Sequence, residues 1–201
     1  MNGKTHAGIA AVTYVAICSN LPCKFNYGTA AVFIFASLLP DIDHPNSFIN
    51  KKILRIKNKK TKTFLYVCLG ISVLYYNFIY KQSAVLLSLG ISLLIVAFSS
   101  HRNGFTHSLT GLITFSIVSG YIGSAYHDYS IIYWFMLGYG MHLLCDMMTT
   151  KGVPLFYPFM KKNIKFPLTY SINSNLGKII EDSIMILGLV YIIYKLPKLK
   201  F

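Results

Sequence analysis

The six carboxylate and six imidazole side chains are the groups in this chain that could bind a metal ion or transfer protons. A first cluster closes an apolar run, where Asp41, Asp43 and His44 lie between Pro40 and Pro45. Because proline fixes φ, the two prolines stiffen the turn that presents these side chains. The pattern predicts metal ligands. The alternative is a helix-ending turn whose Asp residues only accept hydrogen bonds from backbone amides.

A second cluster surrounds Gly104 and contains His101, Arg102 and His107. Glycine permits the tight backbone turn that would bring the two imidazoles together. A guanidinium beside a cation site is unfavourable unless an anion is bound as well, and arginine grips phosphate with a bidentate fork. The segment therefore predicts a metal site that also holds a phosphate group, with an ordinary interfacial loop as the alternative.

A third cluster is the pair His142 and Asp146, whose spacing of four residues puts both side chains on one face of a helix. A helix can offer two ligands to one metal ion in this way. The alternative is a core histidine satisfied by its neighbours. Two further residues do not indicate a metal site by themselves: His6, one turn into the first apolar run, and Glu181, before the last one. We include them because of the other clusters.

Together these residues are too many for one tetrahedral zinc ion, which takes four ligands, and they predict a cluster of two or three ions. Imidazole and carboxylate without a required thiolate suit Zn²⁺ first, with Mn²⁺ or Fe as alternatives. Sites of this kind activate water and stabilise in-line displacement at phosphorus. Catalytic roles are predicted for Arg102 and Asp43. The predicted metal ligands are His6, Asp41, Asp43, His44, His101, His107, His142, Asp146 and Glu181.

Apolar helices must position these residues. Runs without Asp, Glu, Lys or Arg cover residues 5–23, 25–40, 63–80, 82–100, 108–126, 129–145 and 183–194. A spanning helix needs about 20 apolar residues, so the sequence predicts an all-α, polytopic membrane bundle of five to six helices in one domain, 1–201. The last run is the weakest of these helices. The first is expected to be retained, because Ile17 before Cys18 is not the small residue of a cleaved signal peptide.

The composition agrees with a membrane location. Charged residues make up 12% of the chain, hydrophobic residues 54%, and the mean hydropathy is +0.53. The surface of a water-soluble globule of this size would then be largely apolar, which excludes an ordinary soluble domain. Intrinsic disorder and a disulfide scaffold are excluded as well, because 15% of the residues are aromatic and only four are cysteines.

Basic residues predict the orientation, because cytoplasmic loops collect Lys and Arg. Seven of the twelve residues at 51–62 are basic, and alternating helices then place the N-terminus and most other Lys and Arg on the same, cytoplasmic side. The predicted ligands fall on that side too, whereas His127 and Asp128 fall on the other. We interpret segment 51–62 as a loop anchored on anionic lipid. A nucleic-acid patch is the alternative, and no nucleic-acid partner is expected.

Three blocks carry a resemblance to a known family: PDIDHP at 40–45, FTHSL at 105–109 and HLLCDMMTTKGVPL at 142–155. With these blocks the chain resembles, over roughly residues 1–182, the YdjM-type family of LexA-regulated inner-membrane proteins. The resemblance implies a metal-dependent hydrolase, since this family is thought to be similar to the zinc-dependent phospholipase C and single-strand nuclease superfamily. One departure is Asn103, inserted into a loop that usually reads His-Arg-Gly-x-Thr-His-Ser.

The predicted function is hydrolysis of a phosphoester in a phospholipid or lipid-linked phosphate, with Arg102 holding the phosphate and metal-activated water as nucleophile. The resembled superfamily uses an N-terminal amine as a ligand, which is not expected here because Met1 precedes His6 by five residues. One alternative is a metal-ion sensor or carrier using the same ligands, although a carrier's ligands lie near the bilayer midplane. Another is a structural membrane protein without a site.

Overall fold

The computed structural model describes residues 1–20, 24–56, 58–99 and 104–199, and this part of the chain contains helices, irregular segments and two isolated β-bridges. Its α-helices are α1 (Gly3–Asn20), α2 (Tyr27–Leu38), α3 (Lys59–Tyr76), α4 (Ala84–Phe98), α5 (Leu109–Ala125), α6 (Ser130–Met147) and α7 (Asn175–Lys195). Its shorter 3-10 and π turns are η1 (Leu39–Asp43), η2 (Ile49–Ile53), η3 (Asn77–Lys81), η4 (Phe105–His107) and η5 (Leu196–Lys198). The predicted all-α class is confirmed.

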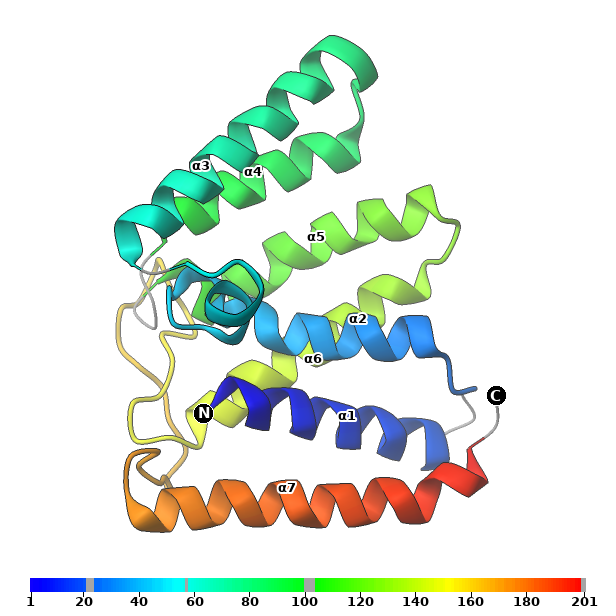
Figure 1. The fold of residues 1–201 in the computed structure, drawn as a ribbon, viewed down its shortest axis with the longest axis vertical. Helices are drawn as coiled ribbons and strands as arrows, with labels where there is room; N and C mark the ends of the chain where they lie inside the picture. The colour runs from blue at the N-terminus through cyan, green and yellow to red at the C-terminus, as the bar shows by residue number, and fades with distance from the viewer. Residues whose placement is uncertain (21–23, 57, 100–103, 200–201) are drawn as a thin grey trace.

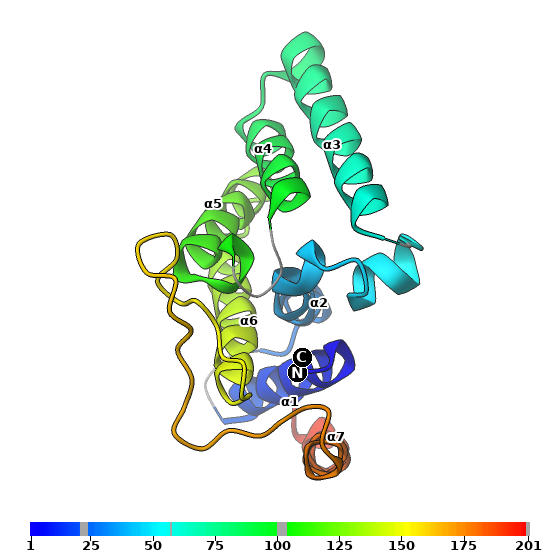
Figure 2. The same cartoon turned by 90° about the vertical axis from the view of Figure 1, so that its left-hand side faces the viewer.

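Successive helices run in opposite directions, so one end of the bundle collects the starts of α1, α3, α5 and α7 and the ends of α2, α4 and α6 (Figure 1). Helix α2 packs between α1 and α6, α5 packs on α6 and α4, and α7 covers α1. Helices α3 and α4 pair as a hairpin that leans away from the other five. Figure 2 looks onto the end where the predicted ligand segments come together.

One helical stretch in the described part of the chain, Lys59–Lys81, is both long and apolar enough to cross a membrane by itself. Ala84–Phe98 and Leu109–Ala125 are apolar but shorter. The expectation of five to six spanning helices therefore remains a prediction beyond this one stretch. The other described α-helices are shorter or less apolar than this stretch, and several carry the polar residues of the site.

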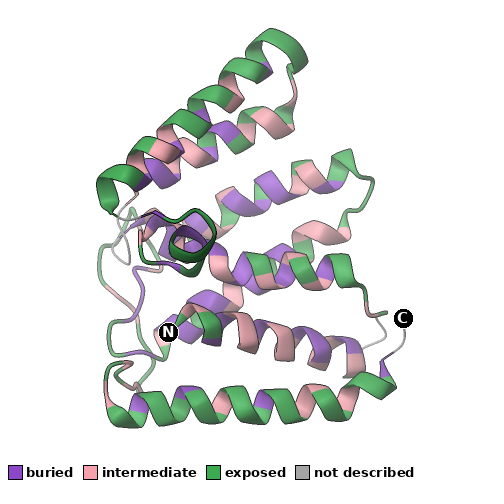
Figure 3. Ribbon diagram, in the orientation of Figure 1, coloured by how far each residue is buried: buried purple, intermediate pink, exposed green. Residues whose placement is uncertain are grey.

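Two clusters of buried hydrophobic residues fill the interior: one includes Leu39, Val96 and Tyr139, and the other includes Tyr14, Cys18 and Leu199. Figure 3 shows buried residues gathered where the helix ends meet, while α3 and α7 are exposed along much of their length. The exposed side chains include Phe64 and Ile71 on α3 and Leu187 and Val190 on α7. Apolar outer faces of this kind suit contact with lipid rather than water.

The last helix is longer than its apolar run. The charge-free run predicts a short helix at 183–194, but α7 begins at Asn175 and has 21 residues. Ser174 caps it by accepting a hydrogen bond from the Gly177 N–H. The added turns carry Glu181, so a rule based on charge-free length alone misses the part of α7 that faces the site.

The basic segment 51–62 is not a single loop. Its first residues belong to η2, its last four form the first turn of α3, and Asn58 caps that helix by accepting from the Thr61 N–H. Lys62 is fully buried. The interpretation of all seven basic residues as a lipid anchor is therefore wrong for Lys62, whose ammonium group points into the protein.

Candidate metal centre

Four elements deliver the candidate ligands to one end of the bundle. His6 lies in the first turns of α1, Asp41 in η1, His107 in η4, and His142 and Asp146 on the last turns of α6. These five residues form two overlapping groups whose ligand atoms all lie within 4.8 Å of one another. One group is His6, His142 and Asp146, and the other is Asp41, His107 and His142.

Local sequence explains why η1 and η4 interrupt the helices here. Pro40 lies in the first turn of η1, so α2 stops at Leu38 and a 3-10 turn presents Asp41. Ser108 caps α5 by accepting from the Gly111 N–H, which ends η4 directly after His107. Asp41 and His107 therefore lie on short 3-10 turns rather than on long loops.

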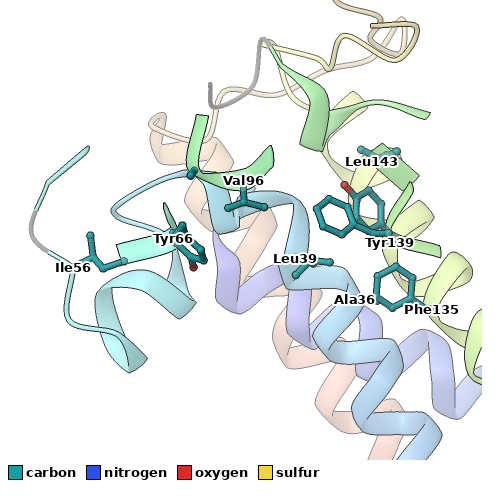
Figure 4. Packing of buried hydrophobic residues seen from close by; sticks show 10 residues of the cluster. Ala36, Leu39, Ile56, Tyr66, Val96, Phe135, Tyr139 and Leu143 are labelled. Carbon is teal, nitrogen blue, oxygen red and sulfur yellow. The ribbon is translucent and has the colours of Figure 1, made fainter. Parts of the chain in front are cut away.

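A close approach of α2 and α6 positions His142. A Cβ on Gly138 would lie 2.3 Å from the carbonyl oxygen of Phe33, so only glycine allows the two backbones to come this near. One turn further along α6, His142 Nδ1 lies 2.7 Å from the carbonyl oxygen of Ser37. Tyr139 stacks against Phe115 and packs with Phe135 in the core beneath this contact (Figure 4).

The core of the site is the pair His107 and His142, whose Nε2 atoms are 3.4 Å apart. Asp41 Oδ1 is 3.4 Å from His107 Nε2 and 4.0 Å from His142 Nε2. Asp146 Oδ2 is 3.7 Å from each of the two nitrogens. Two imidazole nitrogens and two carboxylates thus face one small volume.

Hydrogen bonds on the far side of each ring indicate which nitrogen carries the proton of the neutral imidazole. A carbonyl oxygen can only accept, so the contact with Ser37 places the proton of His142 on Nδ1. The Thr106 hydroxyl donates to Asp43 Oδ2 at 2.7 Å, and its oxygen lies 3.2 Å from His107 Nδ1. That oxygen can therefore accept from His107, which places the ring proton on Nδ1 there as well.

In the neutral rings both Nε2 lone pairs would point into the same volume, an arrangement that favours a proton or a metal ion between them. Zinc–imidazole bonds of about 2.0–2.1 Å at a tetrahedral angle put two ligand nitrogens about 3.3–3.4 Å apart. The observed 3.4 Å separation matches that value. Orientation of each imidazole through its other nitrogen is also the usual outer-shell pattern of metal sites.

The second ligand group extends the site towards α1. The His6 ring stacks on His142 with centroids 3.9 Å apart, and His6 Nε2 lies 3.3 Å from Asp146 Oδ1. His6 Nδ1 is buried without a hydrogen-bond partner among the described residues. The α-amino group of Met1 contacts Asp146 Oδ1. The amino group of Met1 thus lies beside the second ligand group.

Ionisation of the two groups outside the long helices fits this geometry. Burial raises the pKa of Asp41, but the imidazoles of His142 and His107 outweigh it and hold that pKa well below its usual value. Burial lowers the pKa of His107, but Asp41 and the charge of Asp43 outweigh it and raise that pKa. Asp41 is thus an anion, and His107 holds a proton that a metal ion would replace.

The remaining predicted ligands lie near the two groups but outside them. Asp43 is buried and accepts the Thr106 hydroxyl, and His44 Nδ1 accepts from the Asn46 N–H at 3.2 Å. Glu181 accepts from the Thr5 hydroxyl at 2.9 Å, which ties α7 to α1 one residue before His6. His101 and Arg102 lie outside the described residues.

Two residues that the sequence analysis did not select hold η1 in place. Lys62 Nζ donates to the carbonyl oxygen of Asp43 at 3.1 Å and to that of Val96 at 2.9 Å. Asn50 donates through Nδ2 to the carbonyl oxygens of Ile42 and His44 at 2.6 and 2.8 Å. Three consecutive carbonyls of the ligand-bearing turn are therefore bonded from inside the protein. No sequence pattern marks Lys62 within its basic run.

The fold and this set of residues describe a helical protein with apolar outer faces and a buried, one-ended histidine–carboxylate cluster. The family model described as YdjM inner membrane protein matches residues 1–198, and the chain belongs to that family of inner membrane proteins. The Inner membrane protein YdjM of Escherichia coli (strain K12) and that of Shigella flexneri are each 29% identical over 129 residues.

Those matches cover 62% of this chain and 46% of each relative, so the chain spans about half the length of the curated relatives it matches. No solved structure matches the chain. The predicted resemblance to the YdjM family is confirmed.

Proposed function

We propose that this inner membrane protein is a metal-dependent hydrolase that acts on a phosphoester of a phospholipid or lipid-linked phosphate. The observation that carries the proposal is the pair His107 and His142, whose Nε2 atoms face each other at 3.4 Å with Asp41 and Asp146 beside them. A purely structural role gives no reason to bury two imidazoles and two carboxylates in one volume, since burying each ionisable group costs free energy.

The residues divide into ligands and groups that position them. His6, Asp41, His107, His142 and Asp146 would hold one or two divalent ions, with Zn²⁺ best suited to this mixture of imidazole and carboxylate. A bound ion would supply Lewis-acid polarisation of the phosphoryl group and an activated water. Thr106 and Asp43 orient His107, and the Ser37 carbonyl orients His142.

The position of the cluster supports a lipid substrate. The ligands lie at one end of a bundle whose outer faces are apolar, so in a membrane they would lie at headgroup level rather than at the midplane. This end also carries the basic residues that favour the cytoplasmic side. Arg102 remains our candidate for the group that holds the scissile phosphate.

The test is turnover of a panel of phospholipids and lipid-linked phosphates by purified protein loaded with Zn²⁺, Mn²⁺ or Mg²⁺, followed as phosphate or headgroup release. We expect turnover of at least one panel member, and loss of most of it in Arg102→Lys with metal content unchanged, because lysine lacks the bidentate fork. Metal binding without turnover of any member would instead favour a metal sensor.

A further inference from the structure

A pocket of about 330 Å³ opens beside the metal ligands. It lies between the first residues of α1 and the segment that joins η1 to η2, and Asp41 and His44 form part of its wall. The side chain of Asp41 is 14% exposed, whereas that of Asp146 is 1% exposed. Among the carboxylates of the two ligand groups, Asp41 is thus the one that a solute in this pocket can reach.

The pocket is cationic. Lys4, Lys51 and Lys52 line it, and Asp41 is the one carboxylate in its described lining. All three lysines are exposed, and none of them forms an ion pair with a described residue. Three ammonium groups without a described ion-pair partner, placed around an opening that leads to a candidate metal-ligand carboxylate, favour binding of an anionic solute.

The same pocket has an apolar side. Phe48 lines it and is 40% exposed, and a Cβ on Gly3 would lie 3.2 Å from the Phe48 Cβ. The start of α1 therefore packs directly against the Cβ of Phe48. A compound with a charged phosphate and an apolar remainder could place the first among the lysines and the second against Phe48.

We propose that this pocket binds the phosphate group of the substrate, with Lys4, Lys51 and Lys52 as its cationic contacts and Asp41 at its metal-facing wall. The inference rests on the proposed function and specifies where the substrate enters. It also divides the basic segment by role. Lys51 and Lys52 line the pocket, whereas Lys59 and Lys60 are exposed on α3 and do not line it.

The experiment measures binding of inorganic phosphate to detergent-purified, Zn²⁺-loaded protein by isothermal titration calorimetry. The variant is the triple Lys4→Gln, Lys51→Gln and Lys52→Gln, and the matched control is Lys59→Gln with Lys60→Gln. We expect the triple variant to bind phosphate at least about tenfold more weakly and the control to change less than about twofold. The wild-type affinity should fall with added salt, because the contacts are exposed charges.

Two further arms identify the source of the phosphate. Glycerol 3-phosphate tests a soluble ester, and phosphatidic acid in phosphatidylcholine nanodiscs tests a lipid headgroup, each as a competitor of inorganic phosphate. Both competitors should bind more weakly to the triple lysine variant than to the wild type. The competitor that binds the wild type more tightly identifies the source of the phosphate. Phe48→Ser should weaken competition by phosphatidic acid more than competition by glycerol 3-phosphate.

The proposal is overturned if wild-type protein binds no phosphate, or if the triple variant and the control lose affinity equally. Unchanged thermal melting and Zn²⁺ content of the triple variant exclude misfolding as the reason for a loss. Lysine-dependent phosphate binding without turnover of any lipid would leave the pocket supported and the hydrolase rejected, so the two failures are distinguishable.

Discussion

At the scale of single residues, the side chains to test first are those that face the shared volume between α6 and its neighbours. His142 belongs to both ligand groups, and Asp146 approaches His6, His107 and His142. We expect His142→Ala and Asp146→Ala each to lower Zn²⁺ affinity by more than about 100-fold, because each removes a direct ligand. The measurement is ion content after competition with a chelator of known affinity.

His127→Ala is the control for this comparison. His127 lies in the turn between α5 and α6, at the opposite end of the bundle from the cluster. We expect the ion content of His127→Ala to equal that of the wild type. An equal loss in all three variants would show general unfolding and would count against ligation by His142 and Asp146.

Thr106 tests the orientation of His107. Its hydroxyl donates to Asp43 and can accept from His107 Nδ1. Thr106→Val keeps the shape but removes both bonds, and we expect a loss of about 10–100-fold in metal affinity. Thr106→Ser should restore most of that affinity because it restores the hydroxyl. Equal affinities in the two variants would exclude an orienting role.

At the scale of elements, Lys62 connects α3 to the turn that carries the ligands. Its ammonium group donates to the carbonyl oxygens of Asp43 and Val96. We expect Lys62→Met to destabilise the protein by about 1–3 kcal/mol, since it leaves buried carbonyls unpaired, and to lower metal affinity by displacing η1. Lys60→Met, two residues earlier and exposed, should change neither thermal melting in detergent nor ion content. Similar melting temperatures of Lys62→Met and Lys60→Met would refute a stabilising role for the buried Lys62.

The packing of α2 on α6 depends on a single glycine. A Cβ on Gly138 would meet the Phe33 backbone oxygen at 2.3 Å, whereas the nearest atom to a Cβ on Gly140 is Leu112 Cδ1 at 3.8 Å. We therefore expect Gly138→Ala to lower the melting temperature and the metal affinity together, because the His142 contact with Ser37 depends on this approach. Gly140→Ala should be neutral or slightly stabilising, since alanine favours a helix. Indistinguishable melting curves would contradict the packing argument.

At the scale of the whole molecule, strict alternation of the helices makes a topological prediction. Reporters fused after Lys60 and after Lys162 should both indicate the cytoplasm, and one after Gln82 the opposite side, as the distribution of basic residues requires. The measurement is paired phosphatase and fluorescent-protein fusions in cells. A common side for Lys60 and Gln82 would mean that Lys59–Lys81 does not span the membrane.

Much of this architecture was predictable from the sequence because it depends on local composition. Charge-free apolar runs predict helices, and the short polar segments between them predict that His6, Asp41, His107, His142 and Asp146 gather at one end, as the structure shows. The pair His142 and Asp146 shares a helix face for the same local reason, since four residues make about one turn. Family membership also follows from such short blocks.

Only the tertiary structure decided how these residues divide into roles. Asp41 and Asp43 are equivalent in sequence, yet Asp41 faces two imidazoles and Asp43 accepts from Thr106. Lys62 is one of seven basic residues in its segment, and its burial depends on where α4 ends in space. Side-chain direction on a 3-10 turn and the burial of a charge both arise from contacts between elements distant in the chain, which local composition does not specify.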